Sequence, residues 1–148
     1  MKTNFIMKKN DLISLIFIVV LVFFISLWLL EYYFLGDQVN YIGTYSALSD
    51  MSLIEAYKYY NSSLGSKEFI HFILSWLLSG YVSKIFFITV SNALLAYFTA
   101  KLLIKWKVNL VVIFFIVVLN FYFIVLYTGA ERLKFGILFL VISFYYFD

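Results

Sequence analysis

The chain of 148 residues contains no cysteine, no proline and a single histidine, and only 13% of its residues are charged. Without cysteine, disulfide bonds, thiolate metal sites and cysteine nucleophiles are all excluded. One histidine with no second candidate ligand argues against a metal site, and we expect neither a metal nor another cofactor. The sequence also lacks a phosphate-binding Walker loop, a dinucleotide fingerprint, an HExxH zinc motif and a GxSxG serine-hydrolase motif. No soluble-enzyme motif is therefore present.

Apolar residues are abundant instead. Hydrophobic residues make up 65% of the chain and aromatic residues 23%, and the mean hydropathy is +0.99. A soluble domain is typically about half apolar and about a quarter charged. Since this chain has too few polar groups to cover a surface in water, its composition predicts an integral membrane protein in contact with the lipid bilayer.

The apolar residues form long runs that predict an all-α membrane protein with three to four transmembrane helices in one domain over residues 1–148. The predicted spans cover residues 12–34, 81–104, 108–127 and 133–148. Leu12 to Leu30 alone would extend about 28 Å as a helix, close to the thickness of the hydrocarbon core. This run exceeds the apolar stretch of a signal peptide, so we interpret it as an uncleaved anchor. The last run is short, so we expect a truncated piece of a larger bundle.

A polar segment over residues 36–68 separates the first two runs. Within it, residues 51–60 predict a short helix capped by Ser49 or Asp50. Residues 61–66, with the sequence NSSLGS, predict a turn.

The apolar stretch after this segment, from Phe69 to Ala100, would be about 48 Å long as one helix, too long for an upright span. Ser79–Gly80 offers a natural break. We therefore predict a short interfacial helix over residues 69–79, ahead of the second span.

Basic residues set the expected orientation. The net charge is +3, but the basic residues flank the apolar runs, which is typical of membrane topology and not of nucleic-acid binding. Six of them lie before the first run or between the second and third spans: Lys2, Lys8, Lys9, Lys101, Lys105 and Lys107. This favours a cytoplasmic N-terminus and places both polar segments, 36–68 and 129–134, on the outer face.

Two polar groupings at that face carry candidate chemistry. Asp37 lies just outside the first span, and Tyr41 and Tyr45 follow at helical spacing, so a carboxylate and two rings could hold a sugar. An ordinary interfacial loop with aromatic anchors is the alternative. In the second grouping, Arg132 offers a planar fork for a phosphate or diphosphate at a helix start, flanked by Glu131 and Lys134. The alternative is that these cations snorkel to lipid headgroups.

A third grouping, Glu68 and His71, opens the predicted interfacial helix. The histidine is a possible proton carrier because it titrates near neutral pH, and a structural histidine at the membrane interface is the alternative. Asn92 and Asn120 lie inside predicted spans, where we expect them to hydrogen-bond neighbouring helices.

Taken together, these motifs resemble the N-terminal half of bacterial polysaccharide repeat-unit polymerases of the Wzy and EpsG type. The resemblance rests on the Asp-x3-Tyr-x3-Tyr segment at Asp37, the Glu68-Phe69 entry to a short helix and the arginine-containing helix start at Gly129–Gly136. It implies polymerisation of O-antigen, capsule or exopolysaccharide units carried on polyprenyl diphosphate, at the outer face of the bacterial inner membrane.

Within that resemblance, Arg132, Asp37 and Glu131 are candidate catalytic residues. The candidate substrate-binding residues are Tyr41, Tyr45, Lys134, Glu68 and His71. A second polypeptide would supply the missing helices, and no nucleic acid is involved. The rival hypothesis is a non-catalytic small membrane protein: a truncated relic, a flippase-like piece or an assembly partner.

Overall fold

The computed structural model describes residues 7–33 and 37–147, except for the side chain of Asp37. These residues form helices and contain no strand, so the expectation of an all-helical chain is confirmed for them. The elements are α1 (Lys9–Tyr32), α2 (Asp37–Leu48), α3 (Leu53–Leu64), α4 (Phe69–Ser79), α5 (Lys84–Lys105), α6 (Leu110–Phe114), the π-helix η1 (Phe115–Leu119), α7 (Phe121–Thr128) and α8 (Glu131–Phe147).

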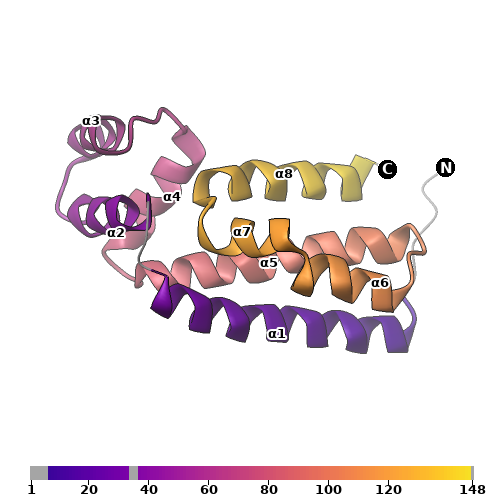
Figure 1. Ribbon diagram of the computed structural model, residues 1–148. Helices are drawn as coiled ribbons and strands as arrows, with labels where there is room; N and C mark the ends of the chain where they lie inside the picture. Colours follow the sequence, from indigo (N-terminus) through magenta and orange to yellow (C-terminus); the bar gives the residue numbers. More distant parts are fainter. Residues whose placement is uncertain (1–6, 34–36, 148) are drawn as a thin grey trace.

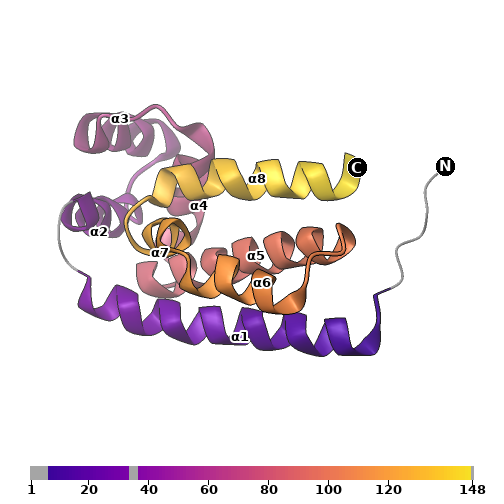
Figure 2. The same ribbon diagram turned by 45° about the vertical axis from the view of Figure 1, so that its right-hand side comes forward.

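The long helices lie side by side as a bundle, and α2, α3 and α4 gather at one end of it (Figure 1). Figure 2 shows the same arrangement from another angle, with α1 along one side of the bundle and α8 along the other. The central helix is α5, which packs against both α1 and α8. The buried stripe of α1 recurs every three or four residues, as a helix face requires: Leu15, Ile18, Val22, Ser26 and Leu30.

Two helices, α1 and α5, are long and apolar enough to cross a membrane, and a third qualifies if α6, η1 and α7 count as one bent span. That third segment was expected to be one uninterrupted helix. It is instead bent by 45° between Leu119 and Phe121, after a five-residue stretch of π-helix. The last helix, α8, has 17 residues, which corresponds to a length of about 25 Å.

The bend has identifiable side-chain causes. Asn120 has an extended backbone, and its side chain caps α7 by accepting a hydrogen bond from the backbone of Tyr122. Tyr127 is buried and donates a hydrogen bond to the carbonyl of Val117, at 2.8 Å, within the π-helix. The expectation that Asn120 hydrogen-bonds a neighbouring helix is therefore wrong, since it caps its own segment.

Asn92 behaves as expected at the centre of the bundle. It is fully buried, and its side-chain amide donates to Ser26 Oγ of α1 and to the carbonyl of Tyr127 in α7, at 3.1 and 2.9 Å. One amide thus links three helices, which accounts for a polar residue in an otherwise apolar core.

The polar segment between α1 and α4 is more helical than its sequence indicates. Residues 37–48 form α2, which was not predicted. The short helix expected over residues 51–60 is α3, and its cap is Ser52 instead of Ser49 or Asp50. Most of the turn expected over residues 61–66 is helical, since α3 continues to Leu64. The turn begins at Gly65, which has a left-handed backbone with φ +59°. Glycine adopts this conformation without the strain that a Cβ atom would bring.

Candidate functional site

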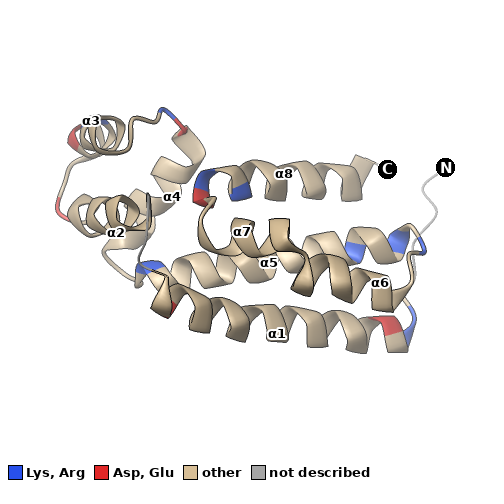
Figure 3. Ribbon diagram, viewed as in Figure 1, with Lys and Arg blue, Asp and Glu red and all other residues tan. Residues whose placement is uncertain are grey.

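Charged residues concentrate at the two ends of the bundle (Figure 3). At one end, the start of α8 meets α2 and α4, although these elements are far apart in the sequence. Gln38 Nε2 of α2 donates a hydrogen bond of 2.6 Å to the carbonyl of Thr128, at the end of α7. The two polar segments therefore meet at the same end of the bundle, as their expected placement on one membrane face requires.

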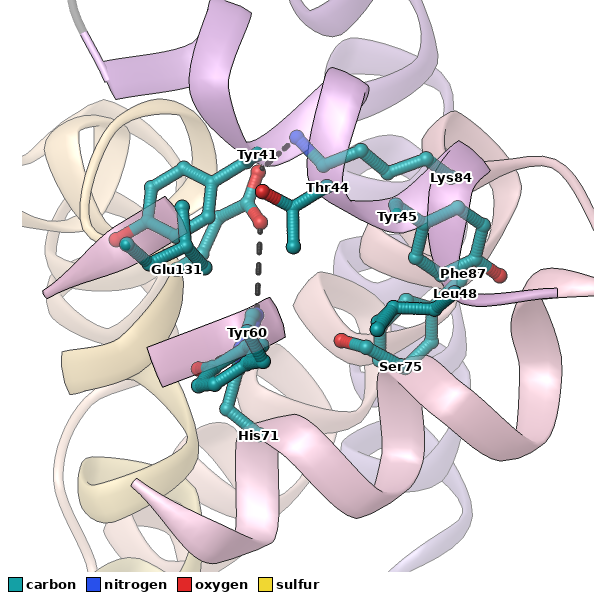
Figure 4. Close-up of a pocket in the computed structure, with 11 residues that line it drawn as sticks. Tyr41, Thr44, Tyr45, Leu48, Tyr60, His71, Ser75, Lys84, Phe87 and Glu131 are labelled. Carbon is teal, nitrogen blue, oxygen red and sulfur yellow. Dashed lines mark hydrogen bonds and ion pairs between the residues drawn. The ribbon is translucent and has the colours of Figure 1, made fainter. Parts of the chain in front are cut away.

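Glu131, in the first turn of α8, lies at the centre of this region and is fully buried. Its Oε1 lies 2.7 Å from Lys84 Nζ, and its Oε2 lies 3.6 Å from His71 Nε2. Figure 4 shows both contacts. Burying a carboxylate is costly unless a cation compensates it. Lys84 supplies that cation.

The direction of the helices explains why this pair forms. Lys84 is the first residue of α5 and Glu131 the first of α8, and these two starts lie at the same end of the bundle (Figure 1). A lysine at a helix N-terminus is unfavourable because that terminus carries partial positive charge, whereas a glutamate there is favourable. The Glu131 carboxylate thus offsets the charge of Lys84 and the partial positive charge at the N-termini of α5 and α8. Lys84 also donates to Gln38 Oε1 at 2.7 Å.

His71, in the first turn of α4, faces Glu131 on one side and Tyr60 on the other. Its Nδ1 lies 2.7 Å from the hydroxyl of Tyr60 in α3. Tyr60 is fully buried, and burial raises the pKa of its phenol. Tyr60 therefore remains a neutral hydrogen-bonding group at neutral pH. The rings of Tyr41 and Phe135 flank the imidazole at 5.7 and 5.5 Å.

Arg132 lies on the outer side of this cluster. Its Nε is 3.4 Å from Glu68 Oε2, with exposed side-chain fractions of 31% and 53% for the two residues. The guanidinium also lies over the ring of Tyr41, at 5.8 Å from the ring centre. Three of the predicted site residues thus form one group, in which Tyr41 is buried while Arg132 and Glu68 retain access to solvent.

Tyr45 is buried like Tyr41, with exposed fractions of 6% and 5%. Its hydroxyl donates to the carbonyl of Val82 at 3.0 Å, and its ring stacks on Phe87 at 5.9 Å. Burial raises its pKa to about 12. These contacts tie α2 to α5, so the ring that was expected to hold a sugar is engaged inside the fold.

Lys134, one turn after Glu131, is fully buried. Its Nζ has no hydrogen-bond partner among residues 7–33 and 37–147. Glu131 and Lys84 are the charged groups that act on it. The expected role of Lys134 in contacting substrate would require the bundle to open.

The remaining predicted catalytic residue, Asp37, begins α2, but its side chain lies outside the described residues. Sequence reasoning missed three members of the cluster: Gln38, Lys84 and Tyr60. Lys84 had a signal, since it is an isolated cation at the start of a long apolar run. The described part of the chain contains no group of three or more histidine, aspartate and glutamate side chains that could hold a metal ion.

A small cavity lies inside the cluster, between α2, α3, α4, α5 and α8. Its volume is about 10 Å³, room for about one water molecule and far below the roughly 300–1,000 Å³ of ordinary ligand pockets. Its polar lining consists of Tyr41, Thr44, Tyr45, Tyr60, His71, Ser75, Lys84 and Glu131.

No protein-family model matches the chain, and neither a curated protein nor a solved structure matches it.

Proposed function

We propose that the chain is part of a membrane-embedded polymerase that joins polyprenyl-diphosphate-linked oligosaccharide units. In this proposal α1, α5, the bent segment α6–α7 and α8 cross the bacterial inner membrane. The N-terminus is cytoplasmic, and the end with α2, α3 and α4 faces outward. Helices from a longer protein or a second polypeptide complete the substrate site.

The group formed by Arg132, Tyr41 and Glu68 is the observation that carries this proposal. An arginine beside a tyrosine ring at the edge of an apolar bundle suits a substrate with a charged diphosphate, a sugar and a lipid tail. Glu68 and the Tyr41 ring hold the guanidinium in place, and such pre-organisation reduces the ordering cost of binding. Arginine binds diphosphate through its planar fork of donors.

In the reaction, a sugar hydroxyl of one unit attacks the anomeric carbon of the other. A new carbon–oxygen bond forms while the bond from that carbon to the diphosphate breaks, and the electron pair leaves with the diphosphate. Arg132 stabilises the charge that develops on the leaving group. The hydroxyl proton passes to a carboxylate, for which Asp37 and Glu131 are the candidates.

The test is to measure glycan chain length in cells that depend on this protein. Arg132→Ala should shorten the glycans, because loss of one such electrostatic contact typically lowers the rate by about 10²–10³-fold. Arg132→Lys should restore chain length only in part, since lysine keeps the charge but lacks the fork. Lys58→Ala, which removes an exposed cation on α3 at the same end, is the matched control. Normal glycans from Arg132→Ala would refute the proposal.

The orientation needs a separate test, and the absence of cysteine makes the chain suitable for single-cysteine labelling. Lys67→Cys and Lys107→Cys place exposed thiols at opposite ends of the bundle. A membrane-impermeant maleimide applied to intact spheroplasts should label only Lys67→Cys. Labelling of Lys107→Cys alone would show that the orientation is opposite to the proposed one. A reaction at the outer face would then be refuted.

The small size of the cavity favours a second candidate, a non-catalytic membrane protein that assists assembly. At about 10 Å³, the cavity does not accommodate an oligosaccharide in this conformation. Under this alternative the buried cluster only holds the helices together, and Arg132 variants would leave glycan length unchanged.

A further inference from the structure

Three polar atoms of residues that line the cavity have no hydrogen-bond partner among the described residues: His71 Nε2 and both carboxylate oxygens of Glu131. Glu131 Oε1 is ion-paired with Lys84 at 2.7 Å, which leaves His71 Nε2 and Glu131 Oε2. They lie 3.6 Å apart, which is too long for a direct hydrogen bond. Both side chains are almost completely buried, with exposed fractions of 5% and 1%. Buried polar groups in folded proteins nearly always have a partner, and a third group can supply one across such a distance.

The chemistry of the neighbours defines what this third group must be. A carboxylate only accepts hydrogen bonds, so the imidazole nitrogen facing Glu131 carries the proton. With the ring proton on Nε2, Nδ1 accepts a hydrogen bond from the Tyr60 hydroxyl at 2.7 Å. The cavity therefore presents one donor, at His71 Nε2, and one acceptor, at Glu131 Oε2.

We propose that the cavity is a binding site for a hydroxyl group, which accepts a hydrogen bond from His71 and donates one to Glu131. A hydroxyl offers a donor and an acceptor on one small atom. An anion would be repelled by the carboxylate, and a cation by Lys84 and Lys134. The surrounding side chains of Thr44 and Ser75 add further hydroxyl groups to the lining.

The same chemistry comes from two sources, a water molecule or the acceptor sugar. The second source rests on the proposed function and requires the cavity to open, since about 10 Å³ admits one hydroxyl group but not a sugar ring. It would place the attacking hydroxyl beside Glu131. The site would then bind the nucleophile, while Arg132 on the outer side binds the diphosphate.

The single histidine makes the site directly observable by nuclear magnetic resonance. The full chain, labelled with ¹⁵N-histidine and reconstituted in lipid nanodiscs, gives ring signals from His71 alone. Magnetisation transfer from water to the ring reports a bound water, and methyl β-glucoside is the sugar probe. We expect transfer from water in its absence. When methyl β-glucoside is added, transfer from the sugar protons in place of water identifies the sugar as the source. Unchanged transfer from water identifies water as the source.

Two substitutions in α4 provide the comparison. Ser75→Val fills the cavity and should abolish the transfer, while Ser79→Val, one turn further along and outside the cavity, should leave it intact. If Ser75→Val fails to fold, Ser75→Thr adds a similar volume and retains a hydroxyl. Equal transfer in the Ser75 and Ser79 variants overturns the proposal, as does an absence of transfer from both water and sugar in the native chain. A persistent water signal alongside normal glycans from Arg132→Ala would refute the polymerase and leave the hydroxyl site standing.

Discussion

Removal of the Glu131 carboxylate should destabilise the protein severely. Glu131→Leu leaves Lys84 without its counterion, and the exposed side-chain fractions of the two residues are 1% and 10%. Fully buried Lys134 also loses a neighbouring negative charge. Breaking a buried ion pair by removing one partner typically costs about 3–5 kcal/mol, because the remaining charge is buried and uncompensated.

Glu68→Leu is the matched control, since it removes the partner of Arg132 from a pair that is substantially exposed. Solvent screens such a pair, and its loss should cost only about 0–1 kcal/mol. The double variant Glu131→Leu with Lys84→Met replaces both charges by apolar groups. It should recover much of the lost stability, because apolar replacement of a whole buried pair is often tolerated.

Equilibrium unfolding of the purified protein in mixed micelles measures these differences, with the three tryptophans as fluorescent reporters. The reasoning fails if Glu131→Leu is no more destabilising than Glu68→Leu. It also fails if the double variant is as unstable as Glu131→Leu alone, because the damage would then come from lost packing and not from an uncompensated charge.

Three further perturbations test local features of the fold by the same unfolding measurement. Gly65→Ala should destabilise the protein by about 1 kcal/mol, because Gly65 has a left-handed backbone. Gly43→Ala should stabilise it by about 0.5–1 kcal/mol, because Gly43 lies inside α2 with open space around it. Equal effects of the two substitutions would contradict this. Tyr127→Phe should cost about 1–3 kcal/mol by leaving a buried carbonyl of the π-helix unpaired, and a neutral effect would argue against that bond. Hydrogen bonds from Ser52 lower the pKa of Glu55. The cap therefore stabilises α3 at neutral pH, and this stabilisation is lost as the pH falls through the lowered pKa. Glu55→Ala should remove this pH dependence of stability.

The sequence predicted the parts of the fold that depend on local patterns. The bounds of α4 follow from the break at Ser79–Gly80, and the apolar runs place α1 and α5. In contrast, α2 was not predicted, because residues 37–48 combine polar residues with few strong helix formers. The bend near Asn120 was also missed, since a π-helix and a capping asparagine leave no gap in an apolar pattern.

The candidate site was predicted only where its residues are close in the sequence. Glu131 and Arg132 were singled out together, but their side chains have opposite environments, one buried and one partly exposed. Lys84 was not singled out as a candidate site residue. Its pairing with Glu131 depends on the parallel arrangement of α5 and α8, which is a tertiary property that no local pattern encodes.

The pairing of Lys84 with Glu131 has a consequence for the order of synthesis. The ribosome makes α5 well before α8, so the nascent chain carries a lysine at the start of an apolar helix while its counterion is still untranslated. Until α8 arrives, that lysine must remain in contact with water. The ion pair therefore closes only after α8 has been made.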